Sequence, residues 1–209
     1  MLLNATDMHL KVTNQELLDP LEKDGLKLNS RGFISAEKMP VIWRGPMVRG
    51  AVMQLMAQTN WGKLDYLIVD TPPGTGDVQL TLLQKIALSA AIVVTTPQDI
   101  AVADTMKGIE MLKKLNLPIL GLIENMSYFE PKDSKKRYYL YGKGGAKTLS
   151  KEYQLDLLGE VPQFEFEESN LTNQNMEISK ILDLIASKVV KKLDSMSSKN
   201  KSLIPQVNK

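Results

Sequence analysis

The strongest candidates for catalytic or ligand-binding residues lie in one short segment, DTPPGTGD, which runs from Asp70 to Asp77. It directly follows residues 66–69 (YLIV), an apolar run with the composition of a buried strand. Ligands of open α/β sheets gather at the carboxyl ends of the strands. Asp70 would therefore stand at a strand tip, where a carboxylate can assist a nucleotide-bound Mg²⁺ that keeps several of its waters.

The rest of this segment has the composition of a phosphate-contacting loop. Gly74 and Gly76 would let backbone N–H groups approach phosphate oxygens closely. Thr75 and Asp77 could orient a water molecule or contact a partner across an interface. The alternative is a strand followed by a tight turn, in which Asp70 and Asp77 serve only as caps.

The elements that must position this loop are four apolar runs and four helical patterns. Continuous apolar runs are typical of parallel strands that are covered on both faces. The runs are residues 66–69, 90–95, 118–123 and 157–161, and the helical patterns are residues 46–58, 99–115, 146–153 and 176–193. Their alternation predicts an α/β fold, a mostly parallel sheet with helices on both faces and right-handed crossovers.

Length and composition suit one globular domain, which we predict over residues 1–193. The chain has 209 residues, of which 43% are hydrophobic and 24% charged. A short strand is expected near residues 26–28, and the Ser/Lys/Asn-rich residues 194–209 are predicted to form a disordered basic tail. The net charge of +2 is too mild to indicate a nucleic-acid partner. No apolar run reaches the roughly 18 residues of a membrane helix.

The chain contains no cysteine and only one histidine, His9. Disulfides, thiolate catalysis and Cys-ligated zinc or iron–sulfur sites are therefore excluded within this chain. A site built from several histidines is excluded as well, so no metal ligand is assigned beyond a contact of Asp70 to Mg²⁺ through water.

Five segments together resemble the Mrp/ApbC family of P-loop ATPases, which are relatives of MinD and of nitrogenase iron protein. They are DYLIVDTPPGTGDVQLTL (65–82), WRGPM (43–47), TTPQDIA (95–101), GLIENMSYF (121–129) and LGEVP (158–162). Members of this family act as iron–sulfur cluster carriers or assembly scaffolds. The resemblance implies ATP with Mg²⁺ as cofactor, a [4Fe–4S] cluster as the family's cargo, and iron–sulfur apoproteins as clients.

The resemblance also implies roles for individual residues. Asp70 would be the Walker B aspartate, and Gly74, Thr75, Gly76 and Asp77 would form the loop that senses the γ-phosphate. Asp70 and Asp77 would then be the catalytic pair.

Outside this loop, the resemblance implies that Asn125 recognises the base, although a helix or turn cap is the alternative for this residue. Trp43 and Arg44 would serve a dimer interface, or else be a buried tryptophan beside a solvated arginine. A homodimer or a heterodimer with a homologue is expected.

The chain departs from the family pattern in the phosphate-binding loop. The KGGVGKS/T strand–loop–helix that opens the family's domain is absent, so we expect an incomplete molecule or a free-standing variant whose residues 1–30 cover the open sheet edge. GKGGAKT (142–148) resembles a shortened P-loop, but it lacks one residue of the required spacing. We expect it to have a different role.

A second departure concerns the cluster ligands. The family follows N-M-S-Y-F with a C-P-x-C pair, whereas here Phe129 is followed by EPKDSKKR (130–137). Carboxylates are poor substitutes for thiolates, so this chain cannot hold a cluster in the family's manner. The replacement is predicted to be an exposed loop, one that could dock a partner.

The function predicted from the sequence is an ATP-binding iron–sulfur carrier or assembly protein whose nucleotide state gates dimer geometry and transfer to clients. The alternative is a nucleotide-incompetent scaffold that pairs with a complete homologue. A MinD/ParA-type positioning ATPase is disfavoured, because WRGP, DTPPGTGD and ENMSYF point away from it. Enzymatic activity stays open, since the Walker A loop is absent. The resemblance implies a cytoplasmic location, or a mitochondrial one in a eukaryote.

Overall fold

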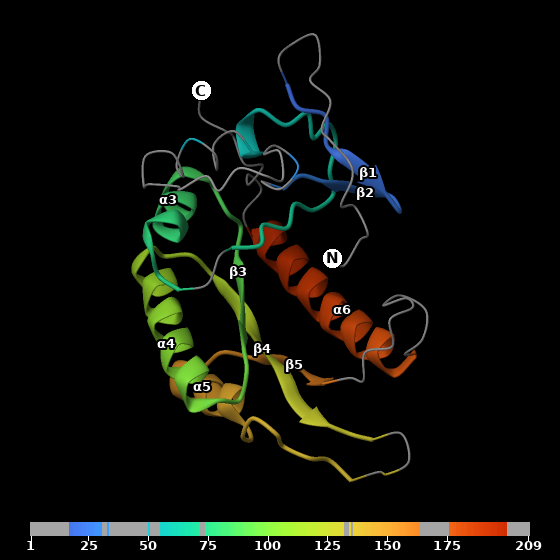
Figure 1. Ribbon diagram of the computed structural model, residues 1–209. Coiled ribbons are helices and arrows are strands. Elements are labelled where there is room, and N and C mark those ends of the chain that lie inside the picture. Colours follow the sequence, from blue (N-terminus) through green and yellow to red (C-terminus); the bar gives the residue numbers. More distant parts are fainter. Residues whose placement is uncertain are drawn as a thin grey trace. The chain divides into compact units, whose positions relative to one another are not determined.

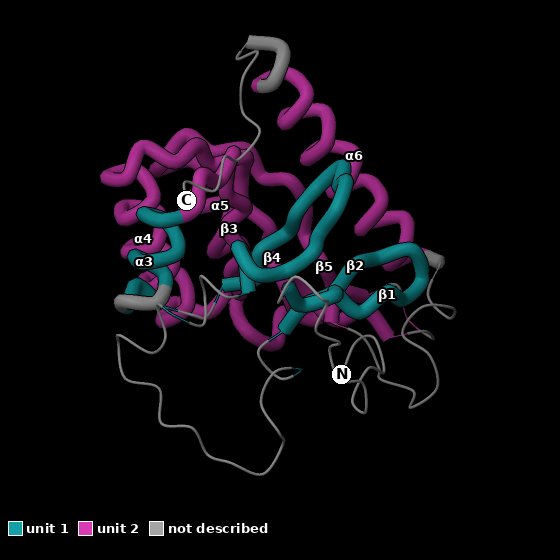
Figure 2. The backbone as a smooth tube through the Cα atoms, turned by 90° about the horizontal axis from the view of Figure 1, so that it is seen from above, with its two compact units in different colours: residues 1–85, 209 teal, residues 86–208 magenta. Residues whose placement is uncertain are grey.

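The computed structural model describes residues 17–30, 33, 50, 55–71, 74–131, 134, 136–163 and 176–199. The chain divides into two compact units, unit 1 (residues 1–85 with residue 209) and unit 2 (residues 86–208), which Figure 2 colours separately. Each unit is described by itself, and the single domain predicted for residues 1–193 stays a prediction. Among the described residues, no helix is both long and apolar enough to cross a membrane.

Unit 2 is built on a parallel sheet of three strands in the order β3-β4-β5 (Figure 1). The strands are β3 (Ala91–Thr95), β4 (Ile119–Phe129) and β5 (Leu157–Gln163). Three of the four predicted strands and their parallel pairing are therefore confirmed. β4 continues six residues past the predicted end at Ile123, because its polar second half still pairs with β5 through Asn125 and Phe129.

Helices cover both faces of this sheet, as the apolar runs predicted. α4 (Asp99–Lys114) and α5 (Gly145–Tyr153) lie on one side, and α6 (Met176–Lys199) lies on the other (Figure 1). The core on the α4/α5 side consists of four fully buried side chains, Ile109, Leu122, Ala146 and Leu149. α6 is six residues longer than predicted, so the first residues of the predicted tail are helical.

Two glycines allow the elements of unit 2 to approach each other closely. A Cβ atom on Gly121 would lie 2.5 Å from the carbonyl oxygen of Asp156, and one on Gly159 would lie 2.5 Å from the Cδ1 atom of Ile185. Real Cβ atoms do not come that close to other heavy atoms. The sequence therefore needs glycine at both positions for β4 to pair with β5 and for α6 to pack on β5.

Unit 1 contains a hairpin of β1 (Leu21–Lys23) and β2 (Leu26–Leu28), which pair antiparallel. The predicted strand at residues 26–28 is confirmed. The two turn residues, Asp24 and Gly25, have φ values of 51° and 76°. Left-handed backbone at both central positions is typical of a type I′ turn, for which Asp-Gly is a favoured sequence.

The strand predicted at residues 66–69 is wrong, because the structure shows no strand there. Tyr66, Leu67 and Ile68 are exposed, the last at 89% of its surface. No described residue offers this run a strand partner, and an apolar run without a backbone partner does not become a strand. Of the helix predicted at residues 46–58, residues 50 and 55–57 are helical, residue 58 is not, and residues 46–49 and 51–54 lie outside the described residues.

Candidate functional site

The DTPPGTGD loop of unit 1 ends at a helix that the sequence did not predict, α3 (Asp77–Lys85). The amide of Leu80 donates to the carbonyl of Gly76 over 3.1 Å, which closes the first helical turn. Gly74 has a φ of 91°, a conformation that glycine adopts without strain. A Cβ atom on Gly74 or Gly76 would meet no heavy atom within 4 Å. The loop thus leaves open backbone beside a helix N-terminus, where anions are favoured.

Asp70 lies at the start of this loop with its side chain exposed. Its carboxylate accepts no hydrogen bond and forms no ion pair with any residue in the described part of the chain. Thr75 is exposed as well. The backbone of Asp77 begins α3, while its side chain lies outside the described residues. The structure therefore places Gly74, Thr75 and Gly76 directly before α3, which begins at Asp77, and leaves the Asp70 carboxylate without a partner among the described residues.

Asn125 lies in unit 2, near the middle of β4 rather than at the tip of the strand that was predicted to end at Ile123. Its Oδ1 accepts a hydrogen bond from the backbone amide of Met126 over 3.0 Å, and Met126 has a φ of 53°. The contact is made within β4. Its Nδ2 group donates to no described residue, so a base-reading role stays a prediction. Trp43 and Arg44 lie outside the described residues.

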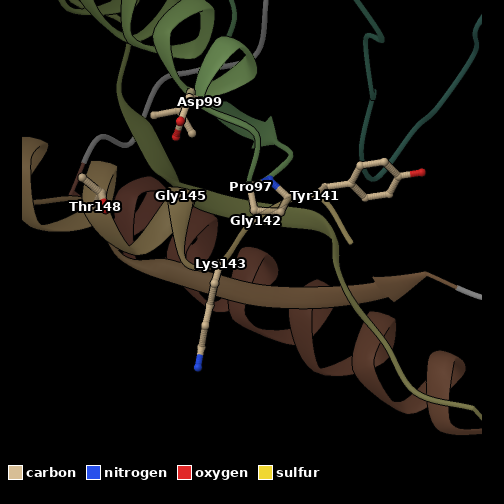
Figure 3. Close-up of a pocket in the computed structure, with 8 residues that line it drawn as sticks. Pro97, Asp99, Tyr141, Gly142, Lys143, Gly145 and Thr148 are labelled. Atoms are coloured by element: carbon tan, nitrogen blue, oxygen red, sulfur yellow. The ribbon is translucent and has the colours of Figure 1, made fainter. Parts of the chain in front are cut away.

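Unit 2 holds a cavity of about 220 Å³ just beyond the carboxyl end of β3 (Figure 3). It lies between the first turns of α4 and α5 and the loop that precedes α5. Its lining consists of Pro97, Asp99, Val102, Tyr141, Gly142, Lys143, Gly145 and Thr148. The cavity thus joins the TTPQDIA and GKGGAKT segments, two motifs that are far apart in the sequence.

The N-terminus of α5 is already bonded to a carboxylate of the same chain. The amide of Ala146 donates to Oε2 of Glu124 over 2.6 Å, and Glu124 is only 1% exposed. This buried glutamate takes the place that a bound anion would need at the helix end. Sequence reasoning missed Glu124, although a charged residue inside an apolar strand is itself a signal.

The two lysines of the GKGGAKT segment are also engaged elsewhere. Lys147 forms an ion pair with Glu160 over 2.9 Å, and that hydrogen bond raises the pKa of Lys147. The ammonium of Lys143 lies 4.6 Å from the centre of the Tyr139 ring. Figure 3 shows the Lys143 side chain extending away from Pro97 and Asp99. Because both ammonium groups already have partners within the chain, these contacts argue against a phosphate-binding loop at this position, as the spacing of the motif also does.

The residues present do not fit a metal cluster. The chain has no cysteine, and no group of three or more His, Asp or Glu side chains gathers within its described ranges. Nothing in them replaces the four thiolates that a [4Fe–4S] cluster requires. By contrast, the exposed Asp70 carboxylate and the open loop backbone suit a magnesium–nucleotide, whose ligands are oxygens.

Comparison with known proteins gives three consistent findings. A family model described as NUBPL iron-transfer P-loop NTPase matches residues 1–198. An iron–sulfur cluster carrier protein of Aquifex aeolicus is 49% identical over 144 residues, which are 68% of this chain and 40% of the relative. The iron–sulfur cluster transfer protein NUBPL of Mus musculus is 47% identical over 152 residues, 73% of this chain and 48% of the relative.

A solved structure is similar too. It is a nucleotide-binding protein from Archaeoglobus fulgidus in complex with ADP, which matches with a TM-score of 0.62 at 28% identity over 94% of this chain and 71% of that chain. The chain spans about half the length, or less, of the curated relatives it matches.

Proposed function

This chain belongs to the family of NUBPL iron-transfer P-loop NTPases, and from that premise we propose that it is the Walker B and switch portion of a nucleotide-binding iron–sulfur carrier. Asp70 assists the Mg²⁺ of a bound nucleotide, and the loop from Gly74 to Asp77 responds to the terminal phosphate. The nucleotide state gates the geometry of a dimer and thereby the transfer of a cluster to client apoproteins.

One observation carries this proposal, the unpartnered Asp70 carboxylate that leads into an open glycine loop and the first turn of α3. A bound magnesium–nucleotide would supply the phosphate charge that these groups are arranged to meet. Asp70 would hold one water of the cation, because Mg²⁺ retains much of its hydration shell in proteins. The amides of the loop and of the α3 N-terminus would donate to phosphate oxygens.

The cluster is the cargo of this proposed activity, and no cluster ligand is assigned to this chain. Its relatives carry printed names as cluster carriers and transfer proteins. Because thiolates are absent here, we assign to this chain the nucleotide response and the contact with clients. Asn125 would read the base with its Nδ2 group, which its contact with Met126 leaves available.

The test is a titration of the full chain with a fluorescent ATP analogue, with Mg²⁺ and with EDTA. We expect Mg²⁺-dependent binding that Asp70→Asn weakens about tenfold, which corresponds to about 1.4 kcal/mol. Asp65→Asn is the matched control, because Asp65 is also exposed and this substitution removes the same charge five residues earlier in the chain. Binding that survives EDTA, or that both variants weaken equally, would contradict the proposal.

The second candidate function is a nucleotide-incompetent scaffold that pairs with a complete homologue. It is favoured by one observation, that the α5 N-terminus and both lysines of GKGGAKT are bonded within the chain. This candidate predicts no nucleotide binding by the chain alone, together with a stable complex when it is mixed with a full-length relative. Size-exclusion chromatography of the mixture distinguishes the two candidates.

A further inference from the structure

The segment in which this chain departs from the family's cysteine motif forms a distinct feature of unit 2. We call residues 128–143 the arm. At its base, the amides of Phe129 and Tyr138 each donate to the other's carbonyl over 2.8 Å, which closes an antiparallel pair. Residues 132, 133 and 135 lie outside the described residues. Figure 1 shows the described residues on either side, which lead away from the end of β4 and back toward α5.

The arm exposes apolar and aromatic surface. Tyr138 and Tyr139 are about two-fifths exposed, and Leu140 is 58% exposed. Three consecutive large side chains of this kind present a patch that water covers unfavourably. At its C-terminal end the arm lies close to the segment before α4, since a Cβ atom on Gly142 would lie 3.1 Å from the carbonyl oxygen of Pro97.

The arm is also strongly basic. The described part of the arm contains three basic side chains, Lys136, Arg137 and Lys143, and one acidic side chain, Glu130. Glu130 is already paired with Arg137 over 3.0 Å, and that hydrogen bond raises the pKa of the guanidinium. Lys136 and Lys143 are exposed, and among described residues neither has a carboxylate partner. Positive charge is thus gathered beside the apolar patch.

The cations of the arm are held against its rings. Arg137 lies 4.1 Å from the centre of the Tyr128 ring, Lys143 4.6 Å from that of Tyr139, and Lys136 5.4 Å from that of Tyr138. Such cation–π contacts orient the charged groups before a partner arrives, which lowers the entropy lost on binding.

These contacts decide between two kinds of anionic partner. Single-stranded nucleic acid would need open ring faces on which its bases can stack. Here each of three tyrosine rings has a cation over one face, so each ring offers a base one face at most without displacing a lysine or an arginine. A carboxylate-rich protein segment needs only the cations, and its apolar side chains can lie on Leu140 and the ring edges.

From this arrangement we propose that the arm is a docking surface for an acidic, leucine-containing segment of a partner protein. The proposal is independent of nucleotide binding, because no residue of the 70–77 loop takes part. Carboxylates of the segment contact Lys136 and Lys143, and an apolar side chain of the segment covers Leu140.

The test uses a fluorescein-labelled twelve-residue peptide of alternating Glu-Glu-Leu as the probe, with anisotropy as the readout. We expect binding that weakens about tenfold from low salt to about 0.5 M salt, since screening shortens the range of charge–charge attraction. The double variant Lys136→Glu/Lys143→Glu should weaken binding by at least about tenfold. Leu140→Ser should weaken it about threefold, through the loss of apolar contact.

The matched control is Lys180→Glu/Lys191→Glu, which makes the same charge change at two exposed lysines of α6. It should leave binding unchanged within twofold, which would show that position matters and not net charge. The milder pair Lys136→Gln/Lys143→Gln serves if charge reversal disturbs the fold, as judged by circular dichroism.

Three outcomes would overturn the proposal. They are no binding of the acidic peptide, equal weakening by the arm variant and the α6 control, and tighter binding of a twelve-nucleotide oligothymidine than of the peptide. The last would identify the arm as a nucleic-acid surface instead.

Discussion

Residues 66–69 in unit 1 and β3 in unit 2 carry nearly the same apolar chemistry, yet their structures differ. β3 pairs with β4 through five residue pairs, and Thr95 at its end is 4% exposed and accepts a hydrogen bond from Thr105 of α4. Residues 66–69 form no strand, and Ile68 is 89% exposed. This difference indicates that an apolar run supplies strand propensity, while a backbone partner and a covering helix decide whether a strand forms.

The largest expected effect is on the free energy of unfolding, compared between a buried residue of β4 and an exposed residue of the 66–69 segment. Leu122→Ala should lower the free energy of unfolding by about 2–5 kcal/mol, because Leu122 is fully buried between β4 and α4/α5. Ile68→Ala should change it by less than about 0.5 kcal/mol, because this side chain is exposed. Urea denaturation followed by circular dichroism measures both. A comparable loss in the two variants would mean that residues 66–69 are packed in solution.

The same variants test the predicted single domain. Trp43 and Trp61 are the only tryptophans, and both belong to unit 1, so tryptophan fluorescence reports on that unit. If residues 1–193 fold as one cooperative domain, Leu122→Ala should shift the fluorescence midpoint together with the circular dichroism midpoint. A fluorescence midpoint that does not move would show that the units unfold independently.

A smaller effect is expected at the glutamate that sequence reasoning missed. Glu124→Ala should cost about 1–3 kcal/mol, because the buried amide of Ala146 would lose its acceptor. Glu152→Ala on α5 is the control, since Glu152 is exposed and should cost about 0.5 kcal/mol or less. Thermal or urea unfolding measures both variants. Equal losses of unfolding free energy in the two variants would contradict the role of Glu124 as the acceptor at the start of α5.

Two glycine substitutions should have opposite signs. Gly121→Ala should destabilise unit 2 by about 1–3 kcal/mol, because the new Cβ atom would collide with Asp156 and Leu158. Gly108→Ala should stabilise it by about 0.5–1 kcal/mol, because Gly108 lies within α4 with open space around it. Urea denaturation gives both values. A stable Gly121→Ala variant would mean that β4 and β5 are not this close.

The smallest effect concerns pH and the ion pair between Asp156 and Lys192, which joins α6 to the start of β5. The hydrogen bond and charge of Lys192 hold the pKa of Asp156 below its usual 3.8. A depressed pKa contributes stability above the unfolded-state pKa, and this is lost as pH falls through the folded-state value. The stability difference between the chain and Lys192→Gln should therefore be present at pH 6 and vanish in strong acid. Because Asp156 is largely exposed, the difference should be small. A difference that grows in acid would contradict this prediction.

Much of unit 2 could be predicted, because its signals are local. The continuous apolar runs and the 3.6-residue periodicity located three strands and three helices, with every boundary within six residues of the observed one. The hairpin strand β1 was missed, although the Asp24-Gly25 pair is a strong signal for a two-residue turn. Glu124 was missed because its partner, the amide of Ala146, lies 22 residues away in the sequence.

The candidate site also has one part that local sequence predicts and another part that it does not. The order and spacing of DTPPGTGD were enough to predict a loop that contains Asp70, Gly74, Thr75 and Gly76, whereas the structure shows that Asp77 begins α3 and that the backbone around the glycines is open. The contact between Asn125 and the amide of Met126 within β4 was not predicted, since propensity cannot say which donor a side-chain oxygen meets.

Residue type and local order were enough to predict the family, the parallel α/β arrangement of unit 2 and the absence of thiolate ligands. Only the tertiary structure decided that residues 66–69 are not a strand, that Glu124 bonds the α5 N-terminus and that the cations of the arm lie over its tyrosine rings. The first two outcomes depend on groups distant in sequence, or on their absence from the neighbourhood, and local propensity carries no information about either. The cation–ring contacts join residues that are close in sequence, but they depend on the rotamers that the side chains adopt, which residue order does not give.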